Sequence, residues 1–220
     1  MTIGTPTLIA NNTTGAADTL VTDGGDIAIG SSVVAFCSTL DFDDQVTGLS
    51  DGTANVYVLS AQNPANAGNC PCAFFVCAKT VADIPNGTTF TGTSTNSGQC
   101  FVGIILSIAG ATGGVGASVV TNGTGTSVSL ASGTLAQPSQ IILGLYNPIT
   151  DFVGHSESGG FTAIGGSIPD GFDPIYYQIV DTTAGATLDL SWTNSQAYTA
   201  ALISLIATTA TDALMPQACL

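Results

Sequence analysis

Carboxylates gathered in one short stretch are the first residues of this sequence that could do chemistry. Within DFDDQ, Asp41, Asp43 and Asp44 could supply oxygen ligands to Ca²⁺, with Asp23 and Asp26 of the preceding DGGD as further ligands. Their spacing does not match the helix–loop–helix Ca²⁺ pattern, so a solvated acidic turn is the competing interpretation. Ca²⁺ is the one cofactor that the sequence suggests, and we expect no other.

The single histidine, His155, lies in the glycine-rich stretch GHSESGG, beside a serine and the only glutamate. Neighbouring residues in such a loop do not usually face one another, and the nucleophile motif G-x-S-x-G is not matched. No motif places a carboxylate pair for glycoside hydrolysis, and GATGGVGAS lacks the spacing of phosphate-binding loops. We therefore predict no catalytic residues and a protein that is not an enzyme.

Aromatic residues offer the alternative of a binding surface. Most of them fall in apolar runs, where core packing is the default. Phe152 and Phe161 flank the His155 loop, and we expect them to be the exposed pair. Phe152, His155 and Phe161 are therefore the candidate ligand residues, with a glycan as the ligand.

Three of the six cysteines cluster in NCPCAFFVC. The spacing C-x-C-x4-C fits none of the common zinc patterns, so we expect no bound metal there. Cys37, Cys77 and Cys100 lie in apolar runs and are predicted to be small buried hydrophobes. Cys70 and Cys72 lie in a Gly/Pro/Asn loop, where a disulfide to another loop is the alternative.

The charge of the chain excludes two classes of partner. The net charge is −14, Lys79 is the only basic residue besides the histidine, and there is no arginine. Binding a row of phosphates needs several cations, so we expect neither a nucleic acid nor a membrane surface as partner. The longest apolar run, 101–111, is too short to span a bilayer. The first residues lack the features of a signal peptide, so we expect synthesis in the cytoplasm.

Short apolar runs separated by Gly, Asn, Asp and Pro predict an all-β chain, because no segment shows a helical period with caps. Only 7% of the residues are charged, which leaves few of the long charged side chains that cover helices. The expected strands are 27–37, 55–60, 73–81, 88–94, 100–109, 116–121, 126–131, 139–146, 161–165, 174–181, 186–192 and 197–207.

The sequence contains an internal repeat. Residues 87–109 align without a gap on 185–207, with eight of 23 positions identical, among them TNS and the Ile105/Ile203 pair. SSVVAFC (31–37) likewise resembles SQIILGL (139–145). We predict a jelly-roll-like β-sandwich built from two internally similar halves, about 19–111 and 126–208, in a single domain 19–208. Residues 1–18 are expected to be an N-terminal arm and 209–220 a C-terminal tail.

The strand CFVGIILSIA, within that repeat, is apolar at nearly every position instead of alternating. A strand that faces water on one side alternates apolar and polar residues, so this one is predicted to be central and covered on both faces.

A further set of motifs carries a resemblance. VTDGGDIAIGSSVVAF opens the pattern, IILGL and GFTAIG follow, and ATLDLSWTNS precedes the final apolar strand. In this order the chain resembles tailed-bacteriophage virion structural proteins with jelly-roll or lectin-like β-sandwich domains, over about 19–208. Those proteins normally carry some Lys and Arg, which this chain nearly lacks. The resemblance implies a structural or receptor-facing part of a virion, with the major capsid protein or other virion proteins as partners.

We therefore expect a capsid decoration or cement protein, displayed in many copies on the particle exterior and forming a homo-oligomer, with a trimer as the natural form. The alternative is a tail-associated receptor- or glycan-binding module that uses the loop 150–161.

Overall fold

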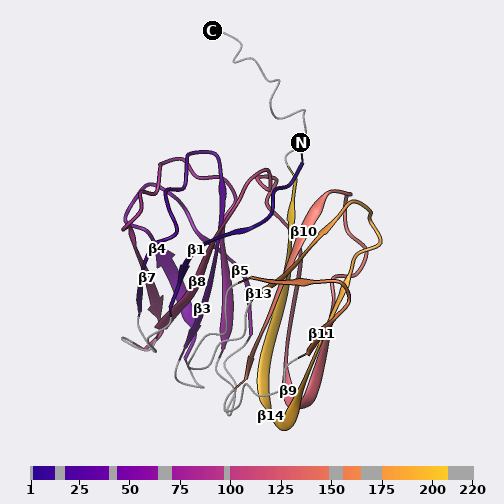
Figure 1. Ribbon diagram of the computed structural model, residues 1–220. Helices are drawn as coiled ribbons and strands as arrows, with labels where there is room; N and C mark the ends of the chain where they lie inside the picture. Colours follow the sequence, from indigo (N-terminus) through magenta and orange to yellow (C-terminus); the bar gives the residue numbers. More distant parts are fainter. Residues whose placement is uncertain are drawn as a thin grey trace.

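The computed structural model of the chain describes residues 2–12, 18–39, 44–63, 71–96, 100–148, 156–164 and 175–207. These residues form fourteen strands and no helix, which confirms the all-β prediction (Figure 1). We call residues 7–108 the first unit and 115–206 the second unit. The first unit contains β1 (Thr7–Asn11), β2 (Thr19–Val21), β3 (Ser32–Thr39), β4 (Val46–Ser50), β5 (Val58–Gln62), β6 (Cys72–Cys77), β7 (Thr89–Ser94) and β8 (Cys100–Ile108). The second unit contains β9 (Val115–Ala131), β10 (Gln140–Pro148), β11 (Ser156–Ser158), β12 (Thr162–Ile164), β13 (Ile175–Val180) and β14 (Thr187–Ile206).

The first unit is a two-layer sandwich. One layer is a five-stranded sheet in the order β1-β8-β3-β6-β5, and the other is a three-stranded sheet in the order β2-β7-β4. Phe90 of β7 and Ile105 of β8 meet in the core between them. Strands β1 to β4 and β6 to β8 alternate between the two sheets, as in a jelly roll, whereas β5 pairs with β6 in the same sheet.

The second unit makes two layers with fewer, longer strands. β9 and β14 pair along most of their length, and their register breaks between Ser191 and Gln196. The part of β14 after the break pairs with β10, whereas the part before it pairs with β11. Leu188 and Leu190, before the break, pack with Leu202, after it, in one core cluster. Each long strand therefore contributes to both layers.

The two units have the same neighbour order once β9 and β14 are each divided at that break. The larger layer runs β9-β14-β10-β13-β12, as β1-β8-β3-β6-β5 does in the first unit, and the smaller layer runs β9-β14-β11, as β2-β7-β4 does. That the chain is built from two internally similar halves stays a prediction.

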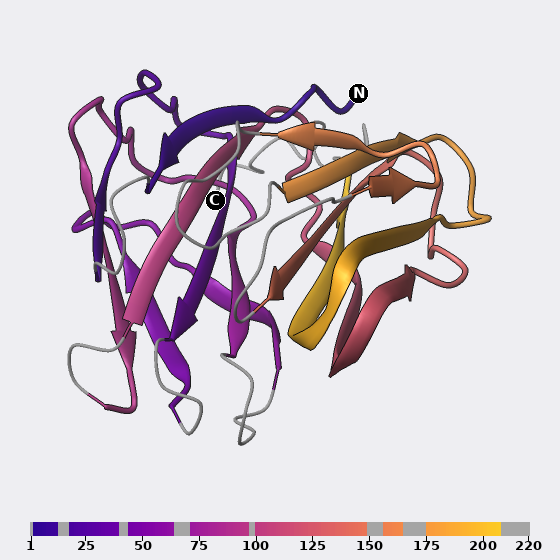
Figure 2. The same ribbon diagram turned by 60° about the horizontal axis from the view of Figure 1, so that its bottom comes forward.

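The larger layers of the two units pack against each other (Figures 1 and 2), where the indigo-to-magenta strands lie beside the orange-to-yellow ones. Their shared core includes Ile104 and Leu106 of β8 and Ile203 and Leu205 of β14. β8 is therefore buried on both faces, by the small sheet of its own unit and by the second unit. This arrangement explains why its sequence does not alternate, and it confirms the prediction of a central strand.

Two expected breaks between strands were wrong. β9 continues through TNGTGTS, between the expected strands 116–121 and 126–131, and the expected strands 186–192 and 197–207 are joined in β14. Residues 7–11, within the predicted N-terminal arm, form β1, the edge strand next to β8. Pairing with a neighbouring strand outweighed the local turn and loop composition in each case.

The ungapped alignment also places core residues on opposite faces. Ile105 faces the small sheet of the first unit, whereas Ile203, its aligned partner, faces the first unit from the second. A shift of one residue aligns Ile104 with Ile203 and Leu106 with Leu205, all of which lie in the shared core. The sequence could not reveal this shift, because a strand that is apolar on both faces does not specify its register.

Candidate functional site

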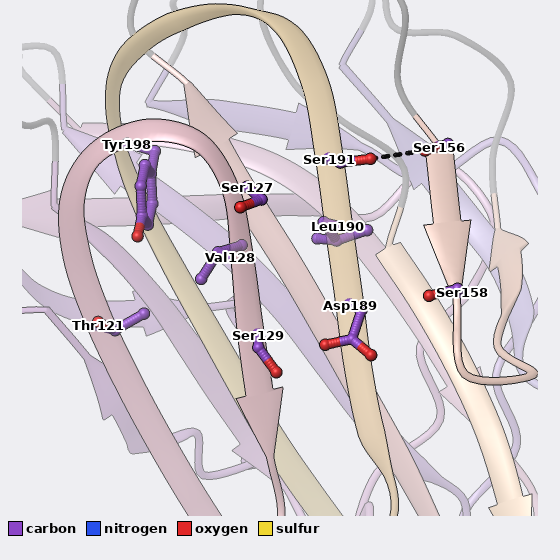
Figure 3. A pocket seen from close by; sticks show the side chains of 10 residues that line it. All are labelled: Thr121, Ser127, Val128, Ser129, Ser156, Ser158, Asp189, Leu190, Ser191 and Tyr198. Atoms are coloured by element: carbon purple, nitrogen blue, oxygen red, sulfur yellow. Dashed lines mark hydrogen bonds between the residues drawn. The ribbon is translucent and has the colours of Figure 1, made fainter.

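A pocket of about 560 Å³ opens on the second unit, where β9 and β14 change layers and the short strand β11 ends (Figure 3). We call it the hydroxyl pocket, because seven of its ten lining side chains carry a hydroxyl group and one carries a carboxylate. Its lining residues are Thr121, Ser127, Val128, Ser129, Ser156, Ser158, Asp189, Leu190, Ser191 and Tyr198.

Strict alternation in β14 produces one wall of this pocket. Leu188, Leu190 and Trp192 point into the core of the second unit, whereas Asp189 and Ser191 between them are exposed. Alternate residues of a strand point to opposite faces of the sheet, so a short run such as LDLSW is enough to place a polar row outside.

Cross-strand pairing aligns the polar residues into two rows. Asp189 lies opposite Ser129 of β9 on one side and Ser158 of β11 on the other, and Figure 3 shows its carboxylate between them. In the second row, the hydroxyl oxygens of Ser156 and Ser191 are 2.7 Å apart and share a hydrogen bond. The Asp189 carboxylate accepts no hydrogen bond from the described residues, so its oxygens are available to a ligand.

A layered aromatic group supports the far side of the pocket. Tyr198 is half-buried and meets Trp192 edge-on, with ring centroids 5.2 Å apart, and Trp192 stacks on Tyr146 at 4.3 Å. The Trp192 indole N–H donates to the backbone oxygen of Gly125, at 2.8 Å. Gly123, opposite Tyr198, leaves room for the phenol, because a Cβ there would lie 2.9 Å from its oxygen.

The chemistry that this arrangement allows is polar recognition. It offers one carboxylate acceptor, a set of hydroxyls that both donate and accept, and one aromatic ring. No lining residue is basic, so a phosphate or sulfate group would meet only negative charge and neutral hydroxyls. Sequence reasoning missed this site, although the alternation in TLDLSW and TSVSLA gave a signal for the exposed rows.

The structure describes only one of the three main Ca²⁺ candidates, since Asp41 and Asp43 lie outside the described residues. Asp44 is buried, and its Oδ1 accepts hydrogen bonds from the backbone N–H groups of Gln45 and Asn96 and from the Thr95 hydroxyl. Burial alone would raise the pKa of Asp44, but these hydrogen bonds outweigh it and lower the pKa.

Asp44 therefore holds the turn at the end of β7, although its Oδ2 has no hydrogen-bond partner among the described residues. Of the two further candidates, Asp26 accepts from the N–H of Asn86 at 2.7 Å. No group of three potential metal ligands occurs in the described ranges. The Ca²⁺ site stays a prediction.

Phe161, one of the two candidate aromatic ligand residues, is not exposed as expected. Phe161 is only 6% exposed, because it packs in the core of the second unit with Tyr176 and Leu188. Its backbone N–H donates to Oε1 of Glu157 at 2.9 Å, which closes the turn between β11 and β12. Phe152 and His155 lie outside the described residues.

The predictions for the three strand cysteines were confirmed, whereas the prediction that Cys72 lies in a loop was wrong. Cys37, Cys77 and Cys100 are buried free thiols, as expected. Cys72 was placed in a loop with a disulfide as the alternative, but it is the first residue of β6, buried and free. Its thiol donates to Oδ1 of Asn63 at 2.7 Å, and burial raises its pKa to about 12. Cys70 lies outside the described residues.

An apolar groove of about 520 Å³ lies mainly on the first unit, along the edge strand β5, and reaches the first residues of β9 in the second unit. We call it the valine groove, because its large exposed apolar side chains are Val56, Val58, Leu59, Val81 and Val115. Val56 and Val81 are 70% and 63% exposed. β5 pairs only with β6, so its other edge lacks a strand partner among the described residues.

The only lysine of the chain lies in the same groove. Lys79 lines it and is exposed, whereas the next residue, Thr80, is buried. Thr80 donates its hydroxyl to the backbone oxygen of Ala28 at 3.0 Å and its N–H to that of Ser31 at 2.8 Å. No acidic residue lines the groove.

Comparisons with known proteins identify no relative of this chain. No protein-family model matches the chain, and no curated protein or solved structure matches it either. Within the described ranges there is no helix long and apolar enough to cross a membrane.

Proposed function

We propose that this protein is a non-enzymatic virion structural protein, a capsid decoration or cement protein that is displayed in many copies on the particle exterior. The observation that supports this proposal best is the valine groove. Large apolar side chains that are exposed together beside an open strand edge are typical of surfaces that associate with another chain.

The occupant that we propose for the groove is a second copy of this chain. Each copy carries 15 acidic side chains and one lysine, so copies repel each other over most of their surface. The groove has no lining acid and holds Lys79, so its lining does not add to this repulsion. A strand edge of one copy can also add to the free edge of β5.

The partners on the particle are the major capsid protein or other virion proteins, and a trimer is the assembly that we propose. A groove that meets a different surface of the next copy forms a heterologous contact, and three such contacts close into a ring.

Solution assembly provides a direct test of the groove. Val81→Ser together with Val56→Ser is expected to lower the assembly state measured by analytical ultracentrifugation, while the melting temperature changes little. Val21→Ser is the matched control, because Val21 is also exposed but does not line the groove. A wild-type chain that stays monomeric at millimolar concentration would contradict the proposed self-association.

The position of the protein on the particle distinguishes capsid decoration from a role in the tail. A cryo-EM reconstruction of the native particle is expected to show copies at symmetric positions over the capsid lattice. Copies found only at the tail would replace decoration by the second candidate function, a tail-associated receptor- or glycan-binding module. The hydroxyl pocket is the observation that favours that second candidate.

A further inference from the structure

We propose that the hydroxyl pocket is a binding site for a neutral saccharide, with Asp189 as its central hydrogen-bond acceptor. This inference deepens the second candidate function and moves it from the 150–161 loop to the junction of β9, β11 and β14. It does not depend on the decoration role.

The charge of the pocket selects the ligand class. Asp189 is the one ionisable carboxylate in the lining, and neither Lys nor Arg is present there to neutralise an anion. A carboxylate accepts hydrogen bonds and donates none, so it favours a ligand with several hydroxyl donors. A sugar ring presents such donors side by side.

The rows of serines fit the rest of such a ligand. Ser129 and Ser158 flank Asp189 across the sheet, and their hydroxyls make no hydrogen bonds to described residues. Each can donate to a ring oxygen or accept from a sugar hydroxyl as required. The neighbouring serines are short and Asp189 is exposed, so its carboxylate is not covered.

Tyr198 provides the apolar contact that saccharide binding needs. It lines the same pocket, and its ring is held by Trp192 and by the close approach to Gly123. An aromatic ring with a polar tip can pack against sugar C–H groups while its phenol hydrogen-bonds. A volume of about 560 Å³ lies within the range of pockets that enclose small ligands.

The first unit contains a natural control for this site. A pocket of about 300 Å³ lies at the corresponding place, where β7 ends and β8 begins, and it is lined by Asp18, Thr91, Thr93 and Cys100 among others. Thr91 occupies the place of Asp189, since Thr19 and Ser50 flank it as Ser129 and Ser158 flank Asp189. This pocket lacks an aromatic residue, so we expect it not to bind a saccharide.

The test begins with a glycan array probed with the wild-type chain. The best-bound glycan is then titrated by calorimetry against wild type and three variants, Asp189→Asn, Asp189→Ala and Thr91→Ala. Loss of a hydrogen bond to a charged group is expected to weaken binding about 10- to 100-fold in both Asp189 variants. Thr91→Ala is expected to bind as wild type does.

Three outcomes would overturn the proposal. The first is an array on which the wild type binds no glycan. The second is binding that the Asp189 variants retain while circular dichroism shows that they are folded. The third is binding that EGTA abolishes, since the carboxylate would then hold a cation. The particle reconstruction tests decoration separately, so each idea can fail without the other.

Discussion

The two units reach the same strand order in different ways, and the difference lies in how the layers are connected. The first unit makes its two layers from eight short strands, with β7 and β8 as separate elements. The second unit runs β14 as one strand of 20 residues through both layers. The pocket at this crossing is about 560 Å³ in the second unit and about 300 Å³ in the first. A continuous strand therefore leaves a larger hollow at the place where it changes layers.

The surfaces of the units differ as well. Exposed apolar side chains gather on the first unit, in the valine groove, whereas exposed hydroxyls gather on the second, in the hydroxyl pocket. The two proposals thus fall on different units. A shared backbone arrangement can carry two surface chemistries, because alternate residues of a strand are free to change without altering the core.

The largest expected effect concerns β8, the strand that lies between the small sheet of the first unit and the second unit. Ile105→Asp would bury an unpaired charge and is expected to abolish folding. The milder Ile105→Ala is expected to cost about 2–5 kcal/mol of unfolding free energy. Trp192, the only tryptophan, reports on the second unit, so urea unfolding followed by its fluorescence tests whether the two units unfold together.

We expect Ile105→Ala to lower the Trp192 midpoint, because both faces of β8 are packed and the second unit covers one of them. A Trp192 transition that does not move, with a separate earlier step in circular dichroism, would show that the units unfold independently.

The next effect is confined to the first unit. Asp51 follows β4 and accepts hydrogen bonds from Thr53, Asn55 and Tyr57, whereas Gly159 takes the corresponding place after β11. Asp51→Ala is expected to cost about 2–4 kcal/mol, because it leaves buried donors without an acceptor. Chemical denaturation measures the change, and a loss below about 0.5 kcal/mol would contradict it.

The same carboxylate predicts a pH dependence. Burial alone would raise the pKa of Asp51, but hydrogen bonds from Asn55, Thr53 and Tyr57 outweigh it, so the pKa is lowered. A lowered pKa in the folded state contributes stability above the unfolded value of about 3.9, and this is lost as the pH falls toward the folded value. The difference between wild type and Asp51→Ala is therefore expected to be constant near neutral pH and to shrink below about pH 4.

A smaller effect is expected at the junction of the units. The Asn63 side chain is buried and donates to the backbone oxygen of Thr121 at 2.6 Å, while its Oδ1 accepts from Cys72. Asn63→Ala is expected to cost about 1–3 kcal/mol. Ser118→Ala is the control, because Ser118 crosses the same junction with an exposed hydrogen bond to Ser60. Equal losses in the two variants would show that burial of the amide does not matter.

The smallest effect compares the outer faces of the two small sheets. Thr91→Ala and Asp189→Ala are each expected to change the unfolding free energy by less than about 0.5 kcal/mol, since Asp189 is exposed and Thr91 is only partly buried. A stabilisation above about 1 kcal/mol in Asp189→Ala would show that the carboxylate is held at a cost, which is common at binding sites.

The sequence allowed the all-β class, the buried strands and three of the buried cysteines to be predicted, since apolar runs and turn residues carry that information locally. The position of TNGTGTS inside β9 could not be predicted, because its turn propensity was overridden by pairing with β14. The burial of Phe161 depends on how β11 and β12 fold back over β14, which no local pattern encodes. The hydroxyl pocket requires the layer crossing of β14, and the break at 191–196 has no signal of its own.

The single lysine in the valine groove has a consequence for digestion. A protease that cleaves only after lysine or arginine has one target in all 220 residues, the bond from Lys79 to Thr80. Thr80 is anchored on both its backbone and its side chain, so the segment has to open locally before a protease can accommodate it. The rate at which a trypsin-like enzyme cleaves this bond therefore measures that local opening, since the enzyme has no other bond to cut.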